Sequence, residues 1–222
     1  MPTLSKKAKK AWAGLTRIYD NEADILFQLA PDVKESVHRA YGFAAWRHRT
    51  MRRKGAMNRP FIHHPTGVWY LCYLAGGSKS DQKAAFLHDT VEDAHELGDR
   101  RDVVVEAIRQ NFGEKTTKKV VALTNKAGLA KKDKRPWQMA HYAKQPKRVR
   151  LIKACDMTAK LVDCCYDNYW AEAKLKSFIA FVDAYYDMCP ELPAFMRELK
   201  EHAKAELHKQ MANGTLTKRP YS

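Results

Sequence analysis

Apolar residues recur with helical spacing along most of this chain. Between residues 148 and 165, an apolar stripe with i, i+3, i+7 and i+10 spacing marks one face of a helix. The members of this stripe are Ile152, Cys155, Ala159 and Val162. No segment convincingly alternates apolar and polar residues with the two-residue period of a strand. The pattern predicts an all-α fold, a helical bundle with helices over residues 4–19, 32–52, 65–76, 80–91, 101–111, 115–124, 148–165, 168–188 and 192–211.

Two segments interrupt the helical pattern. Residues 53–63 mix basic residues with glycine and proline, and residues 125–147 carry many positive charges and two prolines. We predict irregular structure for both, because such compositions disfavour helices. We also expect three parts in the chain, namely an N-terminal helical extension over residues 1–30, one principal domain over residues 31–211 and a flexible tail over residues 212–222.

Composition and charge narrow the class of protein without naming a ligand. Of the 222 residues, 45% are apolar and 29% are charged, which suits one sizeable core. Forty Lys and Arg residues against 25 Asp and Glu residues give a net charge of +15, which attracts phosphorylated molecules and nucleic acids alike. No apolar run approaches the roughly 18–20 residues of a membrane span. We therefore expect a cytoplasmic protein without a membrane partner, and the sequence leaves open whether it forms a homo-oligomer.

Three short stretches place polar residues inside or beside apolar helix patterns. In His63-His64-Pro65, His64 stands at the mouth of an apolar helix. In AAFLHDTVEDA, which spans residues 84–94, His88 and Asp89 directly follow an apolar turn. In VRLIKACDMTAKLVDC, Asp156 lies beside the apolar stripe, so we expect it to be at least partly buried. A buried carboxylate needs a cation, a metal ion or several hydrogen bonds.

One metal ion shared by the three stretches would compensate for the burial of their polar side chains. We predict that it is held by His64, His88, Asp89 and Asp156. Neighbouring residues of a helix are about 100° apart, so two of them can approach one ion at the helix edge. Two imidazoles and two carboxylates form a mixed nitrogen and oxygen set, which suits manganese, iron or another borderline divalent ion. Such an ion activates water for hydrolysis of a phosphate ester.

Two further carboxylates follow the second histidine. Residues at i and i+4 stack on one face of a helix, so a continuous helix here would place Glu92 beside His88 and Asp93 beside Asp89. Either carboxylate could then orient or deprotonate the attacking water. We predict Glu92 and Asp93 as the catalytic pair.

The combined motifs resemble the HD superfamily of metal-dependent phosphohydrolases, and within it the hydrolase domain of Rel/Spo-type enzymes and their small stand-alone relatives. The resemblance covers about residues 40–163 and includes AWRHRTMRRKG, PFIHHPTGV, AAFLHDTVEDA, the FGE turn at residues 112–114 and VRLIKACD. Those enzymes remove the 3′-pyrophosphate from guanosine tetra- and pentaphosphate, the alarmones of the stringent response, usually with manganese. The resemblance therefore implies a manganese-dependent (p)ppGpp 3′-pyrophosphohydrolase.

The same resemblance implies roles for several basic residues. Arg53 and Lys54 match the basic pair at the nucleotide, where a planar guanidinium can stack on a purine. The family's metal ligands match the four residues predicted above, and its water-activating pair matches Glu92 and Asp93. Lys131 and Arg135, in the basic segment 125–147, could bind the distal phosphates.

One departure from the family pattern affects the choice of substrate. The last family motif usually reads A-D-K-x-x-N-L, whereas this chain has C-D-M-T-A-K-L, so Lys160 replaces an asparagine that meets the nucleotide. At i+4 from Asp156, the Lys160 ammonium could reach a substrate phosphate or pair with Asp156, and the sequence favours neither. A hydrolase of another phosphorylated nucleotide is therefore the alternative, for example of an adenine alarmone, a phosphorylated dinucleotide or a deoxynucleotide. A nucleic-acid-binding protein on the same scaffold is a third reading, supported by the charge but by no recognition motif.

Overall fold

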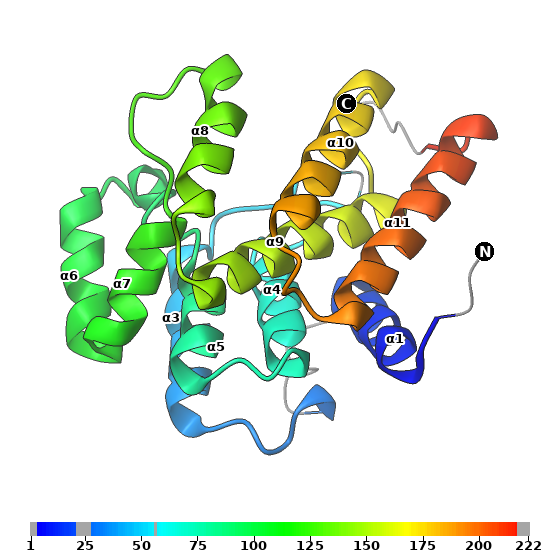
Figure 1. Cartoon of the computed structure of the whole chain (residues 1–222). Coiled ribbons are helices and arrows are strands. Elements are labelled where there is room, and N and C mark those ends of the chain that lie inside the picture. Colours follow the sequence, from blue (N-terminus) through cyan, green and yellow to red (C-terminus); the bar gives the residue numbers. More distant parts are fainter. Residues whose placement is uncertain (1–3, 21–27, 56, 217–222) are drawn as a thin grey trace.

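Helices account for the architecture of the computed structural model, which describes residues 4–20, 28–55 and 57–216 (Figure 1). The helices are α1 (Lys6–Asp20), α3 (Glu35–Arg47), α4 (His63–Leu74), α5 (Lys79–Leu87), α6 (Arg101–Phe112), α7 (Glu114–Leu123), α8 (Lys131–Ala143), α9 (Lys147–Tyr166), α10 (Glu172–Met188) and α11 (Ala194–Ala212), with a short 3₁₀ helix η1 (Ala94–Leu97). Within these residues no strand forms, and a single isolated bridge joins Arg52 to Pro60. The predicted all-α class is confirmed.

Two helices form the centre of the bundle. The helix α9 crosses the middle of the molecule and contacts α4, α5 and α11, as Figure 1 shows. The helix α4 is apolar on all sides, as expected of a helix enclosed by others, and nearly all its residues are buried. Trp69 of α4 stacks on Phe86 of α5, with 5.1 Å between the ring centroids. These contacts hold the N-terminus of α4 beside the end of α5 and the middle of α9.

The helix α1 packs into the same buried core as α4 and α11. Leu15 and Ile18 are almost completely buried, and the hydroxyl of Tyr19 donates a hydrogen bond to the carbonyl oxygen of Ala159 at 2.9 Å. At the other end, α11 stops at Ala212, and residues 217–222 lie outside the described part of the chain. The division into an extension, a principal domain and a tail stays a prediction.

The helix predicted over residues 80–91 is shorter than expected. It ends at Leu87, and residues 88–93 form turns that lead into η1. The Thr90 hydroxyl donates to the carbonyl oxygen of Leu87 at 2.7 Å, which satisfies a carbonyl group that a continuing helix would use. The prediction of a continuous helix through residue 91 is therefore wrong. The predicted approach of Asp93 to Asp89 is kept, because the backbone N–H of Asp93 donates to the carbonyl oxygen of Asp89 at 2.9 Å.

The prediction of irregular structure is confirmed for residues 53–55 and 57–62, with α4 beginning at His63. It is wrong for the middle of residues 125–147, where α8 forms. Trp137 stacks on His141 one turn later at 4.4 Å between ring centroids, and the buried Tyr142 donates its hydroxyl to the carbonyl oxygen of Leu123 at 3.0 Å. These contacts stabilise the helix despite Pro136 in its interior. Among the described residues, no helix is long and apolar enough to cross a bilayer.

Candidate metal centre and active site

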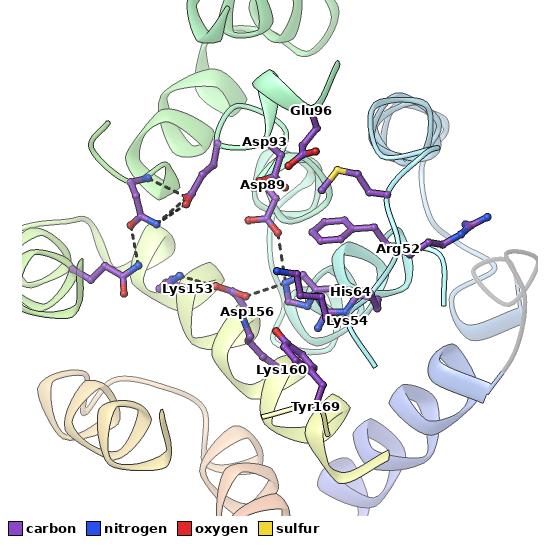
Figure 2. Close-up of a pocket in the computed structure, with 16 residues that line it drawn as sticks. Arg52, Lys54, His64, Asp89, Asp93, Glu96, Lys153, Asp156, Lys160 and Tyr169 are labelled. Carbon is purple, nitrogen blue, oxygen red and sulfur yellow. Dashed lines mark hydrogen bonds and ion pairs between the residues drawn. The ribbon is translucent and has the colours of Figure 1, made fainter. Parts of the chain in front are cut away.

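The structure brings the four predicted metal ligands together from three helices. His64 lies in the first turn of α4, His88 and Asp89 follow the end of α5, and Asp156 lies in the middle of α9. Figure 2 shows the carboxylates of Asp89 and Asp156 approaching His64 from two sides. The convergence follows from the packing of α4 against both α5 and α9, which brings the first turn of α4 and the end of α5 to the middle of α9.

The distances between these side chains suit a single ion. Nε2 of His64 lies 3.0 Å from Oδ1 of Asp156 and 3.7 Å from Oδ2 of Asp89. Nε2 of His88 lies 3.1 Å from Oδ2 of Asp89 and 3.9 Å from Oδ1 of Asp156. Ligand atoms of His64, His88 and Asp89 all lie within 4.8 Å of one another, and Asp156 adds a carboxylate beside both imidazoles.

Hydrogen bonding prepares His88 for a ligand. Its Nδ1 lies 2.8 Å from the carbonyl oxygen of Ala85, so this nitrogen carries the proton and Nε2 is left to face the site. The Nε2 atom is buried and makes no hydrogen bond of good geometry with any residue that the structure describes. A buried ring nitrogen that faces two carboxylates and lacks its own partner fits a divalent cation. In His88 the Nδ1 atom has a hydrogen-bond partner, whereas the Nδ1 atom of His64 is buried without a hydrogen bond to the described residues.

The electrostatics show how strongly the site favours positive charge. Burial lowers the pKa of His64, so its imidazole is neutral, as a metal ligand must be. Burial also opposes charge on His88, yet the carboxylates of Asp89 and Asp156 raise its pKa to about 9. Although burial acts in the opposite direction, the charge of Lys153, a hydrogen bond from His64 and the charge of His88 hold the pKa of Asp156 well below its usual range. A cation bound among these groups would take the place of the proton on His88.

A lysine that the sequence analysis overlooked supports Asp156. The Lys153 ammonium donates to Oδ2 of Asp156 at 2.7 Å, one turn earlier on α9, while Oδ1 faces the imidazoles. Both side chains are largely buried. The i, i+3 spacing of Lys153 and Asp156 was a usable signal in the sequence. The pair fixes the carboxylate so that one oxygen is directed at the candidate ion.

The predicted catalytic carboxylates lie next to the ligand set. Burial, together with the charges of Asp89 and Glu92, raises the pKa of Asp93 to about 8. The Glu92 carboxylate accepts hydrogen bonds from the side-chain amide of Asn125 at 2.8 and 3.0 Å, and the Asn125 oxygen accepts one from Gln138 at 2.8 Å. Asn125 and Gln138 were missed, because neither residue type nor spacing marks them in the sequence.

A cavity of about 400 Å³ opens beside the candidate metal centre. Its walls carry mainly charged and polar side chains, some of which appear in Figure 2. Acidic groups such as Glu92 and Asp93 line it near the ligands, and the basic residues Lys54 and Lys160 line it elsewhere. A cavity of this size, with an acidic candidate metal centre on one wall and added positive charge, suits a phosphorylated small molecule.

Arg53 lines the cavity but is held by a buried carboxylate. Its Nε and Nη2 atoms both donate to Oδ2 of Asp163, and Oδ1 of Asp163 accepts from Arg59. The Arg53 guanidinium lies over the ring of Phe61, with 5.6 Å to the centroid. Burial opposes charge on the Asp163 carboxyl, but the two guanidinium groups lower its pKa. The edge of Arg53 is thus occupied, and only a face of this planar group can serve a nucleotide base.

The loop that carries Arg53 and Lys54 is anchored to the end of α9. The backbone N–H of Met57 donates to Oδ2 of Asp167 at 3.1 Å. A Cβ atom on Gly55 would lie 2.1 Å from the same oxygen, so only glycine allows this close approach. Two carboxylates at the end of α9 therefore hold the loop, Asp163 through Arg53 and Asp167 through the backbone of Met57.

The remaining predicted substrate-binding residues differ in position. Lys54 and Lys160 line the cavity, whereas Lys131 and Arg135 do not. Nη1 of Arg135 donates to the backbone and hydroxyl oxygens of Ser177 on α10. Of the two alternatives for Lys160, an ion pair with Asp156 does not form, and Nζ lies over the ring of Trp170 instead, 5.1 Å from its centroid.

Comparison with known proteins finds relatives of one kind. The guanosine-3′,5′-bis(diphosphate) 3′-pyrophosphohydrolase MESH1 of Xenopus tropicalis is 31% identical over 143 residues, which are 63% of this chain and 76% of that protein. MESH1 of Homo sapiens is 29% identical over the same shares of the two chains. A guanosine-3′,5′-bis(diphosphate) 3′-pyrophosphohydrolase of Aquifex aeolicus is 30% identical over 62% of this chain and 19% of that longer protein.

A solved structure supports the same fold. It belongs to a metazoan ortholog of SpoT that hydrolyzes ppGpp, and it matches 83% of this chain and 98% of its own with a TM-score of 0.68 and 22% identity. No protein-family model matches the chain. At this identity the structural likeness concerns the helical fold, whereas the sequence relatives define the family.

Proposed function

Because this chain belongs to the family of MESH1-type guanosine-3′,5′-bis(diphosphate) 3′-pyrophosphohydrolases, we propose that it removes the 3′-pyrophosphate from a guanosine alarmone in a manganese-dependent reaction. The observation that carries the proposal is the convergence of two imidazoles and two carboxylates beside a cavity with basic residues in its wall. The mixed nitrogen and oxygen donors suit manganese, although they do not distinguish it from other borderline divalent ions.

The roles of the individual side chains follow from their contacts. His64, His88, Asp89 and Asp156 would hold the ion, and Lys153 would keep the Asp156 carboxylate oriented toward it. When bound, a divalent ion acidifies water and neutralises charge on the phosphate group. Glu92, oriented by Asn125, and Asp93 would take the proton of the attacking water.

The proposed hydrolysis forms one phosphorus–oxygen bond and breaks another. The oxygen of water bonds to the phosphorus attached to the 3′-oxygen, and the bond between that phosphorus and the 3′-oxygen breaks. The proton accepted by Glu92 or Asp93 is passed on to the leaving 3′-oxygen. Pyrophosphate and a nucleoside 5′-diphosphate or 5′-triphosphate are the products. The exposed face of the Arg53 guanidinium would stack on the purine, while Lys54 would attract the phosphates.

The direct test is release of pyrophosphate from guanosine tetraphosphate by the purified protein with manganese and with a chelator. We expect turnover that the chelator abolishes and that added manganese restores. In Glu92→Gln, we expect the metal content of the wild type with slower turnover, because the amide cannot accept the proton of water. Intact guanosine tetraphosphate after incubation of the manganese-loaded wild type would refute the proposal.

A second candidate is hydrolysis of another phosphorylated nucleotide, such as an adenine alarmone, a phosphorylated dinucleotide or a deoxynucleotide. The observation that favours it is Lys160, a cation in the cavity wall at a position where the family pattern has an asparagine. A nucleotide panel with manganese separates the two candidates, because cleavage of a different nucleotide alone would favour this second one. The third reading, a nucleic-acid-binding protein, predicts gel-shift binding that survives chelation without any nucleotide turnover.

A further inference from the structure

Two lysines share one tryptophan ring, and one of them, Lys160, lines the cavity. Nζ of Lys160, on α9, lies 5.1 Å from the ring centroid of Trp170, and Nζ of Lys174, on α10, lies 4.6 Å from the same centroid. Phe178 adds a second ring at 5.9 Å from Nζ of Lys160. We call Lys160, Trp170 and Lys174 the lysine–tryptophan cluster. Aromatic faces attract ammonium groups, so the ring holds two like charges close together.

Among the described residues, no ion pair neutralises either lysine of the cluster, although the more distant carboxylates of Asp156 and Asp89 favour the charged form of Lys160. Neither Lys160 nor Lys174 has a carboxylate oxygen within 4.0 Å in the part of the chain that the structure describes. Other cations add to the repulsion: burial first, and then the charges of Lys160 and Lys54, lower the pKa of Lys174. Lys131 and Arg135 act in the same direction. Uncompensated cations gathered in this way form a site for an anion.

The cluster lies beyond the metal centre along α9. Lys160 follows Asp156 by four residues, which is about 6 Å along the helix axis and on the same face. Lys160 lines the same cavity as Asp156, and Tyr169, next to Trp170 in the sequence, lines it as well. A nucleotide whose 3′-phosphates occupy the metal end would therefore extend its remaining phosphates toward the cluster.

We propose that the lysine–tryptophan cluster is a binding subsite for the 5′-phosphate chain of the nucleotide, and that it makes this enzyme select substrates by their 5′-phosphates. The inference rests on the proposed 3′-pyrophosphohydrolase function and adds to it a specificity determinant. Lys160 takes part from the cavity wall and Lys174 from the exposed side, so that a diphosphate could contact both. An asparagine at position 160 would supply a hydrogen bond but no charge.

The first experiment measures the selection for 5′-phosphates through the catalytic efficiency of the enzyme. Guanosine 3′-diphosphates that carry a 5′-diphosphate or a 5′-monophosphate are compared in the wild type, Lys160→Met and Lys174→Met. Methionine keeps an apolar stem over Trp170 while removing the charge. We expect the wild type to prefer the 5′-diphosphate, and each variant to lose about tenfold or more in kcat/KM for it while losing less for the 5′-monophosphate.

Lys176→Met is the matched control. Lys176 lies two residues after Lys174 on α10, on the other side of the helix, and pairs with Glu172 at 2.6 Å. Its loss changes the net charge equally without touching Trp170, so we expect the wild-type ratio between the two substrates. A uniform fall in kcat/KM for both substrates in Lys160→Met and Lys174→Met would overturn the subsite. Lys174→Arg should retain the preference, because it keeps the charge.

The second experiment does not depend on turnover. Guanosine 5′-diphosphate has no 3′-phosphate, so its dissociation constant reports the subsite even if the protein hydrolyses no alarmone. We expect binding in the wild type and Lys176→Met, and a dissociation constant about tenfold or more higher in the Lys160→Met/Lys174→Met double variant. Equal binding in all three proteins, or no binding in the wild type, would overturn the inference. Loss of alarmone turnover with the binding difference intact would instead count against the proposed function alone.

Discussion

Oδ1 of Asp156, in the middle of α9, lies 3.0 Å from Nε2 of His64, in the first turn of α4. The other oxygen of Asp156 accepts from Lys153, so the carboxylate is held between an ammonium group and an imidazole. Neither helix alone could create this arrangement. It depends on the close packing of α4 against α9.

Removal of a predicted ligand should abolish turnover while the fold is preserved. In His88→Ala and in Asp89→Ala, we expect metal-dependent pyrophosphate release to fall to background, because each variant loses a donor to the candidate ion. The helical content and the cooperative thermal transition should persist, as both residues lie in the turns that follow α5 and neither belongs to the apolar core. Circular dichroism and metal analysis provide the measurements. Wild-type turnover in either variant would exclude the proposed ligand set.

Binding of manganese should stabilise the protein, and the stabilisation should grow with the logarithm of the manganese concentration above the dissociation constant. A ligand at one hundred times its dissociation constant adds about 2.7 kcal/mol to the free energy of unfolding. For a chain of this length, this corresponds to a rise in Tm of about 5–10 °C. Thermal melts with and without manganese measure the shift, and His88→Ala is the control in which we expect almost none. A similar shift in both proteins would mean that manganese binds elsewhere.

Asn125→Ala should slow the chemical step without loss of the metal. The variant removes the amide that donates to the Glu92 carboxylate, so Glu92 can rotate away from the attacking water. We expect kcat to fall about tenfold, within the range for residues that orient a catalytic group, with an unchanged metal content. Gln138→Ala, which removes only the hydrogen bond to Asn125, should have a smaller effect. An unaltered kcat in Asn125→Ala would contradict a role for Glu92 in handling water.

Asp163→Asn should weaken both substrate binding and the fold. The variant leaves the buried guanidinium groups of Arg53 and Arg59 without their shared carboxylate. Breaking a buried ion pair costs about 3–5 kcal/mol, and we expect a higher KM because Arg53 is no longer held over Phe61. Asp183→Asn is the control. Asp183 also bridges two cations, Lys200 and Lys204, but it is more exposed, so we expect a loss of about 1 kcal/mol or less.

Acid should destabilise the protein partly through Asp81. This buried carboxylate caps α5 through Ser78 and pairs with Lys119. Burial alone would raise the pKa of Asp81, but hydrogen bonds from Lys119 and Ser78 lower it overall. A lowered pKa in the folded state means that the stabilisation is present above the unfolded value of about 3.9 and is lost as the pH falls through the folded value. Denaturant unfolding between pH 6 and pH 3, with Asp81→Asn as the comparison, should show a flatter pH profile in the variant.

Much of the helical framework could be predicted because the apolar stripes repeat with helical spacing. The convergence of the four candidate ligands could be predicted because carboxylates and imidazoles are costly beside apolar turns unless they share a cation. The helix α8 could not be predicted in this way. Its composition resembles a loop, and the contacts that stabilise it, such as that of Tyr142 with Leu123, join different elements.

Partners of the site residues were also hidden from the sequence. Arg53 could be identified by its place in a motif, but its engagement with Asp163 depends on how the loop meets the end of α9. Asn125 supports Glu92 only because the end of α7 approaches the turns after α5. Such pairings require the three-dimensional path of the chain, since neither spacing nor charge in the sequence indicates them.

The loop that carries Arg53 is attached to the same helix as Asp156, because Gly55 and Met57 approach Asp167 at the end of α9. Asp156 and Asp163 both belong to α9 and are seven residues apart, which corresponds to about 10.5 Å along the axis. One helix thereby sets the spacing between the candidate metal centre, which contains Asp156, and the loop that Asp163 holds through Arg53. In the proposed reaction, the loop that carries Arg53 would therefore keep a constant distance from the candidate metal centre as long as α9 stays straight, and this distance would limit the length of nucleotide that fits.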